Sequence, residues 1–453
     1  MQMRPMPAVG AELELDIVDF TTDGRAVARQ GGLVFFLDSG LIGERARVRV
    51  CGHKKSSVLA EVVQCLSPSP HAVSPFCVRF GECGGCALQN FDYSAQLVWK
   101  RDRLEAALRR LGGVPARVPA VLPSPRLAGY RNKMEYAFGQ GDTGVLLGLR
   151  KRYSHVVCDL EGCALQSEIS GAILGAVKFW ARRHGLDAWN GSEGALRFFI
   201  LREPEFQPEG KPQRLAELIC GSRVPEAEAV NGLWQDLRQL GVASFVLSRC
   251  AANFSVAKGE KILRRMGQPK LWEKIGALTF SFPPESFVQT NTGAAALLYA
   301  EVEEMAALEG KEEVWDIYSG VGALALYLAG KAKLVRGVEL DAVAVRAAKE
   351  NAFHFGFTHC DFAAGDAGKV FVALPGRPDV LVLDPPRGGM HPALIQGIKF
   401  KAPARIVHVS CDPATLARDL ALLAPEYGLE RCLAVDMFPH TPHVESVVLL
   451  IKT

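Results

Sequence analysis

Apolar and polar positions alternate through the first part of the chain, in five short stretches separated by glycines. Alternation with a period of two is typical of strands that bury one face. The stretches are ELELDIVDF, GRAVAR, GLVFFLD, ERARVRVCGHK and SVLAEVVQCL, within residues 8–66. Short strands at this spacing predict a small β-barrel. One edge carries a basic stripe, for which a solvated strand face is the plain alternative. The stripe consists of Arg45, Arg47, Arg49, Lys54 and Lys55.

A segment rich in proline and serine at residues 67–75 ends this pattern. Apolar positions three and four apart then predict one helix over residues 93–111 and another over residues 171–184. Strands and helices mix between about residues 120 and 280, where LRFFILRE and ASFVLSRC are the clearest strands. This middle region carries few motifs that indicate chemistry.

From about residue 285, buried strands alternate with helices. The strand-like runs EVWDI, LVRGVE, VLVLD and ARIVHVS each end in a polar or glycine-rich loop, and GALALYLAGKA and AVAVRAAKENAFHFG have helical spacing. Strand–helix alternation predicts a doubly wound parallel sheet, so the fold class is multidomain α/β. Ligands bind such sheets at the carboxyl ends of the strands, which is where the motifs below fall.

Composition narrows the possibilities only a little. The chain has 453 residues, 49% hydrophobic and 22% charged, which is ordinary for globular domains. Its net charge of +3 does not by itself indicate a nucleic-acid partner, so RNA contacts would need local basic patches. We expect no membrane span and no signal peptide, and hence a cytoplasmic protein. Twelve cysteines in such a protein favour metal binding, catalysis or packing over disulfides.

A glycine turn follows the first strand of the predicted sheet. Gly320 and Gly322 let the backbone turn tightly and approach a ligand. Glu339 ends the next strand, where its carboxylate can accept both ribose hydroxyls of an adenosine, and Asp366 follows the third strand, where adenine would lie. The third glycine of a dinucleotide fingerprint is missing, which disfavours NAD without excluding it. S-adenosylmethionine and other nucleotides fit this turn.

The sequence Asp384-Pro-Pro-Arg387 ends the fourth strand and favours S-adenosylmethionine much more strongly. It places a carboxylate on a rigid backbone beside the reacting group. Versions of this motif with an aromatic residue in the fourth position accompany the methylation of amino groups. Arg387 occupies that position here, which argues against N-methylation of a flipped base.

Cys411 lies in Ser-Cys-Asp-Pro at the end of the next strand, where a thiol is more accessible than in a strand interior. Uracil C5 cannot take a methyl group unaided, but addition of a thiolate to C6 makes C5 nucleophilic. A base must then remove the C5 proton. Glu445, just before the last apolar strand, is the best candidate. Core packing is the alternative for a lone cysteine, and the neighbouring motifs weigh against it.

A cysteine cluster follows the predicted barrel. Cys77, Cys83 and Cys86 lie in a glycine-rich loop, and a closed site needs a fourth ligand. Cys158 and Cys163 are the candidates, and the loop-like surroundings of Cys163 favour it. Spacing alone does not separate zinc from an iron–sulfur cluster, and either would be structural.

Together these motifs resemble the RumA-like RNA 5-methyluridine methyltransferases over nearly the whole length. The resemblance implies an OB-like TRAM barrel over residues 1–67, a central α+β domain with an iron–sulfur loop over residues 68–284, and a Rossmann-like S-adenosylmethionine methyltransferase domain over residues 285–453. It identifies Cys77, Cys83, Cys86 and Cys163 with the ligands of a 4Fe–4S cluster, Cys411 with the nucleophile and Glu445 with the base.

The resemblance also supplies further contacts. Phe287-Val-Gln-Thr-Asn291 looks like the family's F-x-Q-x-N motif, which makes Gln289 a cofactor contact, and Tyr318 falls on another such position, as do Glu339, Asp366 and Asp384. Gly129-Tyr-Arg-Asn-Lys133 matches a family segment and implies RNA contacts for Arg131 and Lys133, with a solvated turn as the alternative. Ala323 departs from the family's frequent asparagine, which puts one cofactor hydrogen bond in doubt.

Relatives that have both the barrel and the cluster usually act on the large ribosomal RNA, so 23S rRNA is the favoured substrate and tRNA the alternative. We expect a monomer that binds neither DNA nor membranes. The target uridine must leave its stack to reach Cys411. Stacking aromatics could come from Tyr136, Phe138 or Phe254, although core packing is the simpler role for each.

Three other functions compete with this one. A nicotinamide-dependent oxidoreductase explains Gly320, Gly322 and Glu339 but leaves Cys411 and Asp384 without a role. A non-catalytic RNA-binding protein needs the barrel and the cluster, but not a cysteine and a glutamate at two strand ends. Methylation at another position of a base would not require that thiol–base pair.

Overall fold

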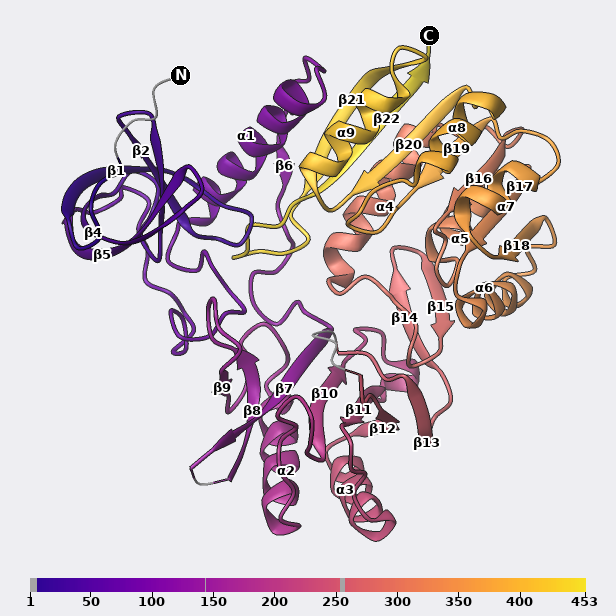
Figure 1. Cartoon of the computed structure of the whole chain (residues 1–453). Coiled ribbons are helices and arrows are strands. Elements are labelled where there is room, and N and C mark those ends of the chain that lie inside the picture. Colours follow the sequence, from indigo (N-terminus) through magenta and orange to yellow (C-terminus); the bar gives the residue numbers. More distant parts are fainter. Residues whose placement is uncertain (1–5, 143, 253–256) are drawn as a thin grey trace. The chain divides into compact units, whose positions relative to one another are not determined.

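The computed structural model describes residues 6–142, 144–252 and 257–453. Its internal contacts divide the chain into two compact units (Figure 1). The first runs to Lys100 and includes Phe438–His443, and the second comprises Arg101–Met437 and Val444–Thr453. The division into three domains at residues 67 and 284 stays a prediction.

The first unit contains a closed five-stranded barrel in the order β1-β2-β3-β5-β4, which confirms the predicted barrel. Side chains that alternate toward its interior, such as Ile17, Phe35 and Val48, are buried. The three arginines of the basic stripe pair with glutamates on neighbouring strands, for example Arg49 with Glu12 at 3.0 Å, so this part of the stripe is an ion-paired strand face. The strands are β1 (Glu12–Phe20), β2 (Ala26–Gln30), β3 (Leu33–Leu37), β4 (Arg45–Lys54) and β5 (Ser57–Ser67). The predicted helix forms as α1 (Tyr93–Leu111).

The second unit contains two large sheets. The first has seven strands in the order β13-β12-β11-β10-β7-β8-β9, antiparallel except between β11 and β12, with α2 packed on β8 and α3 on β12. We call it the central sheet. Its elements are β7 (Lys133–Gly141), β8 (Gly144–Arg150), β9 (Val157–Asp159), α2 (Ile169–Arg183), β10 (Leu196–Arg202), the 3-10 turn η1 (Pro208–Gly210), β11 (Arg214–Cys220), α3 (Ala227–Gln239), β12 (Val242–Arg249) and β13 (Lys261–Gly267).

The second sheet, the C-terminal sheet, has eight strands in the order β18-β17-β16-β19-β20-β22-β21-β6. β18 to β20 are parallel, as the alternation predicted, but β21 and β22 form an antiparallel hairpin that inserts β22 beside β20. A short connection cannot join parallel strands, which explains this departure from a wholly parallel sheet. The strands are β6 (Val121–Leu122), β16 (Glu313–Ile317), β17 (Leu334–Glu339), β18 (Cys360–Ala364), β19 (Val380–Leu383), β20 (Arg405–Ser410), β21 (Tyr427–Val435) and β22 (Glu445–Lys452).

Six helices accompany this sheet in the described residues, and a two-stranded hairpin precedes them. The chain leaves β16 toward β17 and β18, then returns to place β19 on the other side of β16. A crevice forms where the strand order reverses in this way. The hairpin and helices are β14 (Leu271–Ile275), β15 (Leu278–Phe282), α4 (Thr292–Ala306), α5 (Ala323–Ala329), α6 (Ala342–His354), α7 (Ala367–Ala373), α8 (Pro392–Lys401) and α9 (Pro413–Leu423).

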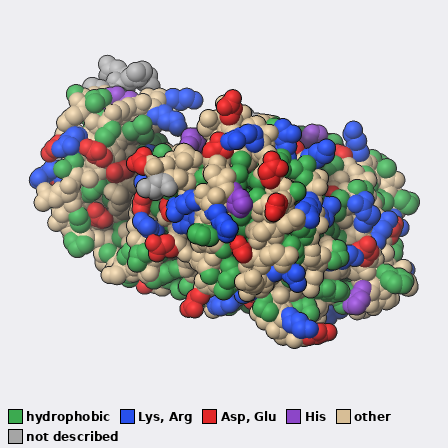
Figure 2. Space-filling model, turned by 90° about the horizontal axis from the view of Figure 1, so that it is seen from below, with side chains coloured by type: hydrophobic (Ala, Val, Ile, Leu, Met, Phe, Trp, Pro, Cys, Tyr) green, Lys and Arg blue, Asp and Glu red, His purple; other side chains and the backbone are tan. Residues whose placement is uncertain are grey.

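Two surface features bear on partners. Within the described residues, no helix combines the length and the apolar character that a membrane span requires. Figure 2 shows Lys and Arg side chains interspersed with Asp and Glu over the face in view, in agreement with the small net charge of +3.

Candidate functional site

A cavity is lined by residues at the carboxyl ends of β16 and β19, at the point where the strand order reverses. It holds about 430 Å3 when the open space at its mouth is included. Four of the residues predicted to bind a cofactor line it: Gln289, Tyr318, Gly320 and Asp384. The other three predicted residues are not in the lining: Gly322, Glu339 and Asp366.

The glycine turn that lines the cavity is hydrogen-bonded to Glu339, the last residue of β17. The Gly320 N–H donates a hydrogen bond to the Glu339 carboxylate at 3.0 Å, and the Asp341 N–H donates to its other oxygen at 2.9 Å. Gly320 has φ +54°, and a Cβ there would meet open space. Gly322 has φ +79°, and a Cβ there would lie 3.1 Å from the Phe362 ring. The glycines therefore have different roles, because Gly320 lines the cavity whereas Gly322 permits close packing behind it.

Asp366 lies near the same cavity without lining it. Its carboxylate accepts a hydrogen bond from the Lys369 N–H at 3.0 Å and so caps α7. Burial, with Asp366 adding to it, raises the pKa of Tyr318 to about 12. Asp366 is therefore close enough to Tyr318 to act on it electrostatically.

Two acidic side chains meet in the cavity. Asp316 is 1% exposed, and its Oδ2 is buried without a hydrogen-bond partner. Burial, and after it the charge of Asp384, raises the pKa of Asp316 to about 8. A buried polar atom without a partner marks a position where a ligand donor can bind. The sequence interpretation did not assign Asp316 a contact, although an acid within the buried run EVWDI was a signal.

Cys411 and Glu445 converge beside this cavity. β20 and β22 are antiparallel, with Ser410 opposite Ser446, so the residues just beyond that pair meet at one sheet edge. Burial, and after it the charge of Glu445, raises the pKa of the Cys411 thiol to about 11, and Arg387 opposes the shift. Burial, together with Asp384, raises the pKa of Glu445 well above its usual range. The structure thus brings together a half-buried thiol, a carboxyl group and a cation that the sequence placed in three separate motifs.

The neighbours of Cys411 shape its loop. The Ser410 hydroxyl accepts the Asp412 N–H at 3.3 Å, and the Asp412 carboxylate accepts the N–H groups of Ala414 and Thr415, both at 2.9 Å. Asp412 is thus the N-cap of α9, and Pro413 occupies its first turn. The Ser-Cys-Asp-Pro motif therefore fixes a strand-to-helix turn that leaves the thiol half-buried.

A clamp that sequence reasoning missed holds the loop after Asp384. Asp419, which is fully buried on α9, accepts the Met390 N–H at 2.9 Å, and its carboxylate lies 3.6 Å from the Nε2 of His408. Arg418 donates to the Gly388 carbonyl at 2.9 Å. These contacts anchor the chain next to Arg387 and so fix the cation that acts on Cys411.

A buried network joins the central sheet to Gln289. The Asn132 side chain donates to the Gln289 carbonyl at 3.0 Å and to the Thr292 hydroxyl at 2.9 Å, and its N–H donates to the Thr290 carbonyl at 2.8 Å. The Thr292 hydroxyl in turn donates to Glu273 at 3.0 Å. Asn132 thus holds the backbone of a predicted cofactor contact.

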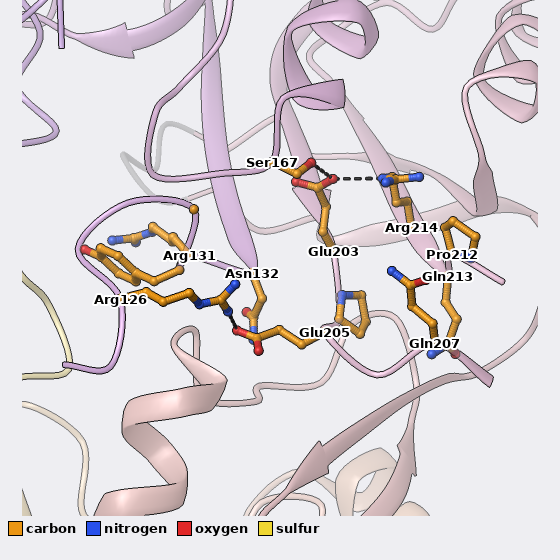
Figure 3. Close-up of a pocket in the computed structure, with 13 residues that line it drawn as sticks. Arg126, Arg131, Asn132, Ser167, Glu203, Glu205, Gln207, Pro212, Gln213 and Arg214 are labelled. Atoms are coloured by element: carbon orange, nitrogen blue, oxygen red, sulfur yellow. Dashed lines mark hydrogen bonds and ion pairs between the residues drawn. The ribbon is translucent and has the colours of Figure 1, made fainter. Parts of the chain in front are cut away.

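Arg131 lines a different, polar cavity of about 720 Å3, shown in Figure 3. Two ion pairs offset two of the three arginines in its wall. Arg126 pairs with Glu205, and the Arg214 Nε donates to Glu203 at 2.9 Å (Figure 3). Lys133, the second predicted RNA contact, is largely buried and donates to Glu135 at 2.7 Å, and its burial lowers the pKa of its ammonium group.

The aromatic residues divide between core and surface. Tyr136 is 0% exposed and Phe138 is 6% exposed, so both belong to the core. Phe254 lies outside the described residues. Phe287 is 66% exposed and lines the cavity with Gln289, so it is better placed to meet a base than Tyr136 or Phe138.

The first unit holds three of the four predicted cluster cysteines. Cys77, Cys83 and Cys86 are each half-buried, and the Gly85 N–H donates to the Cys83 sulfur at 3.4 Å. Thiolate ligands of iron–sulfur clusters accept such bonds. Cys163 lies in the second unit. Among the residues that the structure describes, no group of three or more His, Cys, Asp or Glu side chains is arranged to hold a metal ion. The cluster therefore stays a prediction.

Comparison with known proteins agrees with this geometry. Residues 377–453, which include Asp384, Cys411 and Glu445, match the family model described as tRNA (uracil-5-)-methyltransferase. An uncharacterized RNA methyltransferase of Nitratidesulfovibrio vulgaris is 43% identical, over 98% of this chain and 96% of the relative. One from Halalkalibacterium halodurans is 35% identical, over 97% and 96%. The crystal structure of Pyrococcus abyssi tRNA (uracil-54, C5)-methyltransferase with S-adenosyl-L-homocysteine is similar at a TM-score of 0.76 and 27% identity, over 97% of this chain and 100% of the other.

Proposed function

Because the chain belongs to the RumA-like family of RNA (uracil-5-)-methyltransferases, we propose that it converts uridine in RNA to 5-methyluridine, with Cys411 as nucleophile and Glu445 as base. The observation that carries the proposal is the convergence of Cys411, Glu445 and Arg387 beside the cavity that contains Gln289 and Asp384. A nicotinamide oxidoreductase would use the glycine turn but not this thiol–carboxyl pair.

The chemistry follows from these groups. The Cys411 thiolate adds to uracil C6, which forms an S–C6 bond and moves the C5=C6 electrons toward O4 as an enolate. S-adenosylmethionine supplies a methyl group on an electrophilic sulfonium carbon, and C5 takes that methyl group as S-adenosylhomocysteine leaves. Glu445 then removes the C5 proton, the C5=C6 double bond re-forms, and the S–C6 bond breaks to restore Cys411.

The cavity residues fit the methyl donor. The unpartnered Oδ2 of Asp316 can accept from a donor group of a bound ligand, and Gly320 leaves room where any side chain would intrude. Gln289, Tyr318 and Asp384 complete the lining that we assign to S-adenosylmethionine, with Glu339 and Asp366 beside it. Ala323 is in the lining and offers no side-chain hydrogen bond.

We propose 23S rRNA as the substrate, by analogy with relatives that have both a barrel and a cysteine cluster. The tRNA alternative has a specific support, since the similar Pyrococcus abyssi enzyme is a tRNA methyltransferase. Anaerobically purified protein would be incubated with S-adenosylmethionine and, separately, unmodified 23S rRNA, 16S rRNA and tRNA, and nucleosides would be measured by mass spectrometry. 5-Methyluridine in tRNA alone would overturn the 23S assignment and keep the chemistry.

A 4Fe–4S cluster on Cys77, Cys83, Cys86 and Cys163 is a separate proposal. Thiolates suit iron–sulfur clusters, and the N–H bond to the Cys83 sulfur is of the kind that tunes them. Iron and sulfide would be quantified in anaerobic preparations of the wild type and of Cys83→Ser, with Cys51→Ser, an exposed barrel cysteine, as control. Zinc in place of iron, or no metal at all, would contradict the proposal.

The pH dependence of Cys411 alkylation tests its electrostatic setting. The pKa of the thiol is raised to about 11, chiefly by burial, so the reactive thiolate is a small fraction at neutral pH. The alkylation rate of the free enzyme should therefore rise about tenfold per pH unit below that pKa. Arg387→Ala removes the cation that opposes the shift and should slow alkylation at any fixed pH. Iodoacetamide labelling of Cys411, followed by peptide mass spectrometry, measures both effects. Equal alkylation rates for Arg387→Ala and the wild type would show that Arg387 does not lower the pKa of Cys411.

Loss of Asn132 should weaken cofactor binding from a distance. Asn132→Ala removes the hydrogen bond to the Gln289 carbonyl and leaves buried polar groups unsatisfied, which costs about 1–3 kcal/mol. We expect the affinity for S-adenosylmethionine, measured by titration calorimetry, to fall roughly tenfold. Gln207→Ala, on the exposed wall of the Figure 3 cavity, is the control and should bind normally. Unchanged affinity in Asn132→Ala would show that Gln289 does not depend on this network.

A further inference from the structure

A third cavity lies in the central-sheet region, separate from the lining of the cofactor cavity and from that of Figure 3. It holds about 920 Å3, open space included, and residues of β7, β8 and β10 contribute to its wall together with the segment after α2. Its chemically distinctive lining residues are Arg150, His155, Trp189, Asn190, Arg197 and Phe198.

The charge of this cavity is one-sided. Its described lining includes two arginines and a histidine and no carboxylate. Arg150 and His155 make no ion pair or side-chain hydrogen bond within the described residues. In the Figure 3 cavity, by contrast, Arg126 and Arg214 are each paired with a glutamate. Two of the three arginines in the wall of Figure 3 are thus offset by carboxylates of the same wall, whereas the described lining of the third cavity has no carboxylate to offset its cationic groups.

A second feature points to a ligand. The Trp189 indole Nε1 is buried and has no acceptor. A buried tryptophan N–H usually has a hydrogen-bond acceptor. The acceptor that Trp189 lacks could be supplied by a bound molecule. The ring is held in place because the Arg197 guanidinium lies 4.0 Å from its centroid, and Arg197 itself donates to the Cys250 carbonyl at 2.8 Å.

We propose that this cavity binds one nucleotide of the substrate RNA other than the uridine that is methylated. Cationic groups recognise the phosphate backbone, and indole N–H donors meet the carbonyl oxygens of bases or the oxygens of sugar and phosphate. Arg150 and His155 would take the phosphate, and the Trp189 N–H would take an oxygen acceptor. The inference rests on the proposed function, because it assigns the ligand as part of the same RNA. The proposed site would add an RNA contact on the central sheet, whereas Cys411 and Glu445 both lie on the C-terminal sheet.

Two substitutions and a matched control test this site. Arg150→Ala should weaken RNA binding roughly tenfold. The slope of log K against log salt concentration should also become shallower by about one, as expected for the loss of one phosphate contact. Trp189→Phe keeps a ring against Arg197 but removes the N–H, and should weaken binding roughly fivefold. Arg126→Ala, from the ion-paired wall of Figure 3, is the control and should bind like the wild type. Affinity would be measured with unmodified 23S rRNA and tRNA transcripts across a salt series.

Cofactor affinity and thermal unfolding separate the possible outcomes. Folded Arg150→Ala and Trp189→Phe proteins that bind S-adenosylmethionine normally but lose RNA affinity support the site. RNA affinities equal to that of the wild type in both variants, or an equal loss in Arg126→Ala, overturn it. Failure of the proposed function looks different, since the wild type itself would then form no 5-methyluridine while its RNA affinity could still be compared with that of the variants.

Discussion

Replacement of Cys411 by alanine is expected to abolish formation of 5-methyluridine, with the rate falling by at least about four orders of magnitude. Uracil C5 becomes nucleophilic only after a thiolate has added to C6, and Cys411 is the thiol that Glu445 and Arg387 both influence. No group in the lining of the adjacent cavity can replace it, because the described lining offers carboxyl, amide and hydroxyl groups but no thiol. S-adenosylmethionine should still bind, since Cys411 lies outside the lining that we assign to it.

The measurement is transfer of label from S-adenosylmethionine to RNA, with nucleosides identified by mass spectrometry. Cys360→Ala is a matched control, because Cys360 is also half-buried and belongs to the same sheet, on edge strand β18. Burial raises the pKa of Cys360 to about 12, so it is even less available as a thiolate than Cys411. Cys360→Ala should retain activity. If Cys411→Ala still made 5-methyluridine, the covalent mechanism would be wrong.

The elements that could be predicted are those with a local signal. Alternation along residues 8–66 was enough for the barrel, because a strand with one buried face has a period of two. The apolar runs that end in Gly320, Asp384 and Cys411 were enough for the parallel strands and for the edge on which their motifs meet. Helix α1 formed over the residues that its apolar spacing indicated.

Contacts between distant segments had no such signal. Asn132 and Gln289 are hydrogen-bonded across 157 positions, and no local pattern indicates that Asn132 holds the backbone of a predicted cofactor contact. The clamp between Asp419 and Met390 depends on how α9 packs over the loop after Asp384. The antiparallel insertion of β22, which sets Glu445 against Cys411, depends on hairpin pairing that periodicity does not specify.

Exposure was the other quantity that the sequence left open. Tyr136 and Phe138 lie two residues apart on β7, so their side chains point to the same face of the central sheet, and both are buried. Phe287 is exposed although it is a large apolar residue next to the buried Val288. Its exposure comes from the rim of the cavity, which only the tertiary structure defines.

Glu445→Gln is expected to stop the reaction at a later step than Cys411→Ala. Glutamine has nearly the same shape but cannot take a proton, so addition of the thiolate and methylation of C5 should proceed while removal of the C5 proton fails. Without that proton loss the C5=C6 double bond cannot re-form and the S–C6 bond cannot break. A covalent complex of protein and methylated RNA should therefore accumulate, with turnover reduced by about two to four orders of magnitude.

The complex would be detected as a protein–RNA band that survives denaturing electrophoresis, and a labelled methyl group should migrate with it. The carboxyl of Glu445 is buried, and burial together with Asp384 raises its pKa well above the usual range, which brings its basicity nearer to neutral pH. Turnover of the wild type should consequently fall as the pH drops through that raised pKa, because the protonated carboxyl cannot accept the C5 proton. The double variant Cys411→Ala with Glu445→Gln should form no band. Two results would assign proton removal to another group: normal turnover by Glu445→Gln, or a stable adduct that lacks the methyl label. Asp384 is then the next candidate for the base, because its charge already acts on both Cys411 and Glu445.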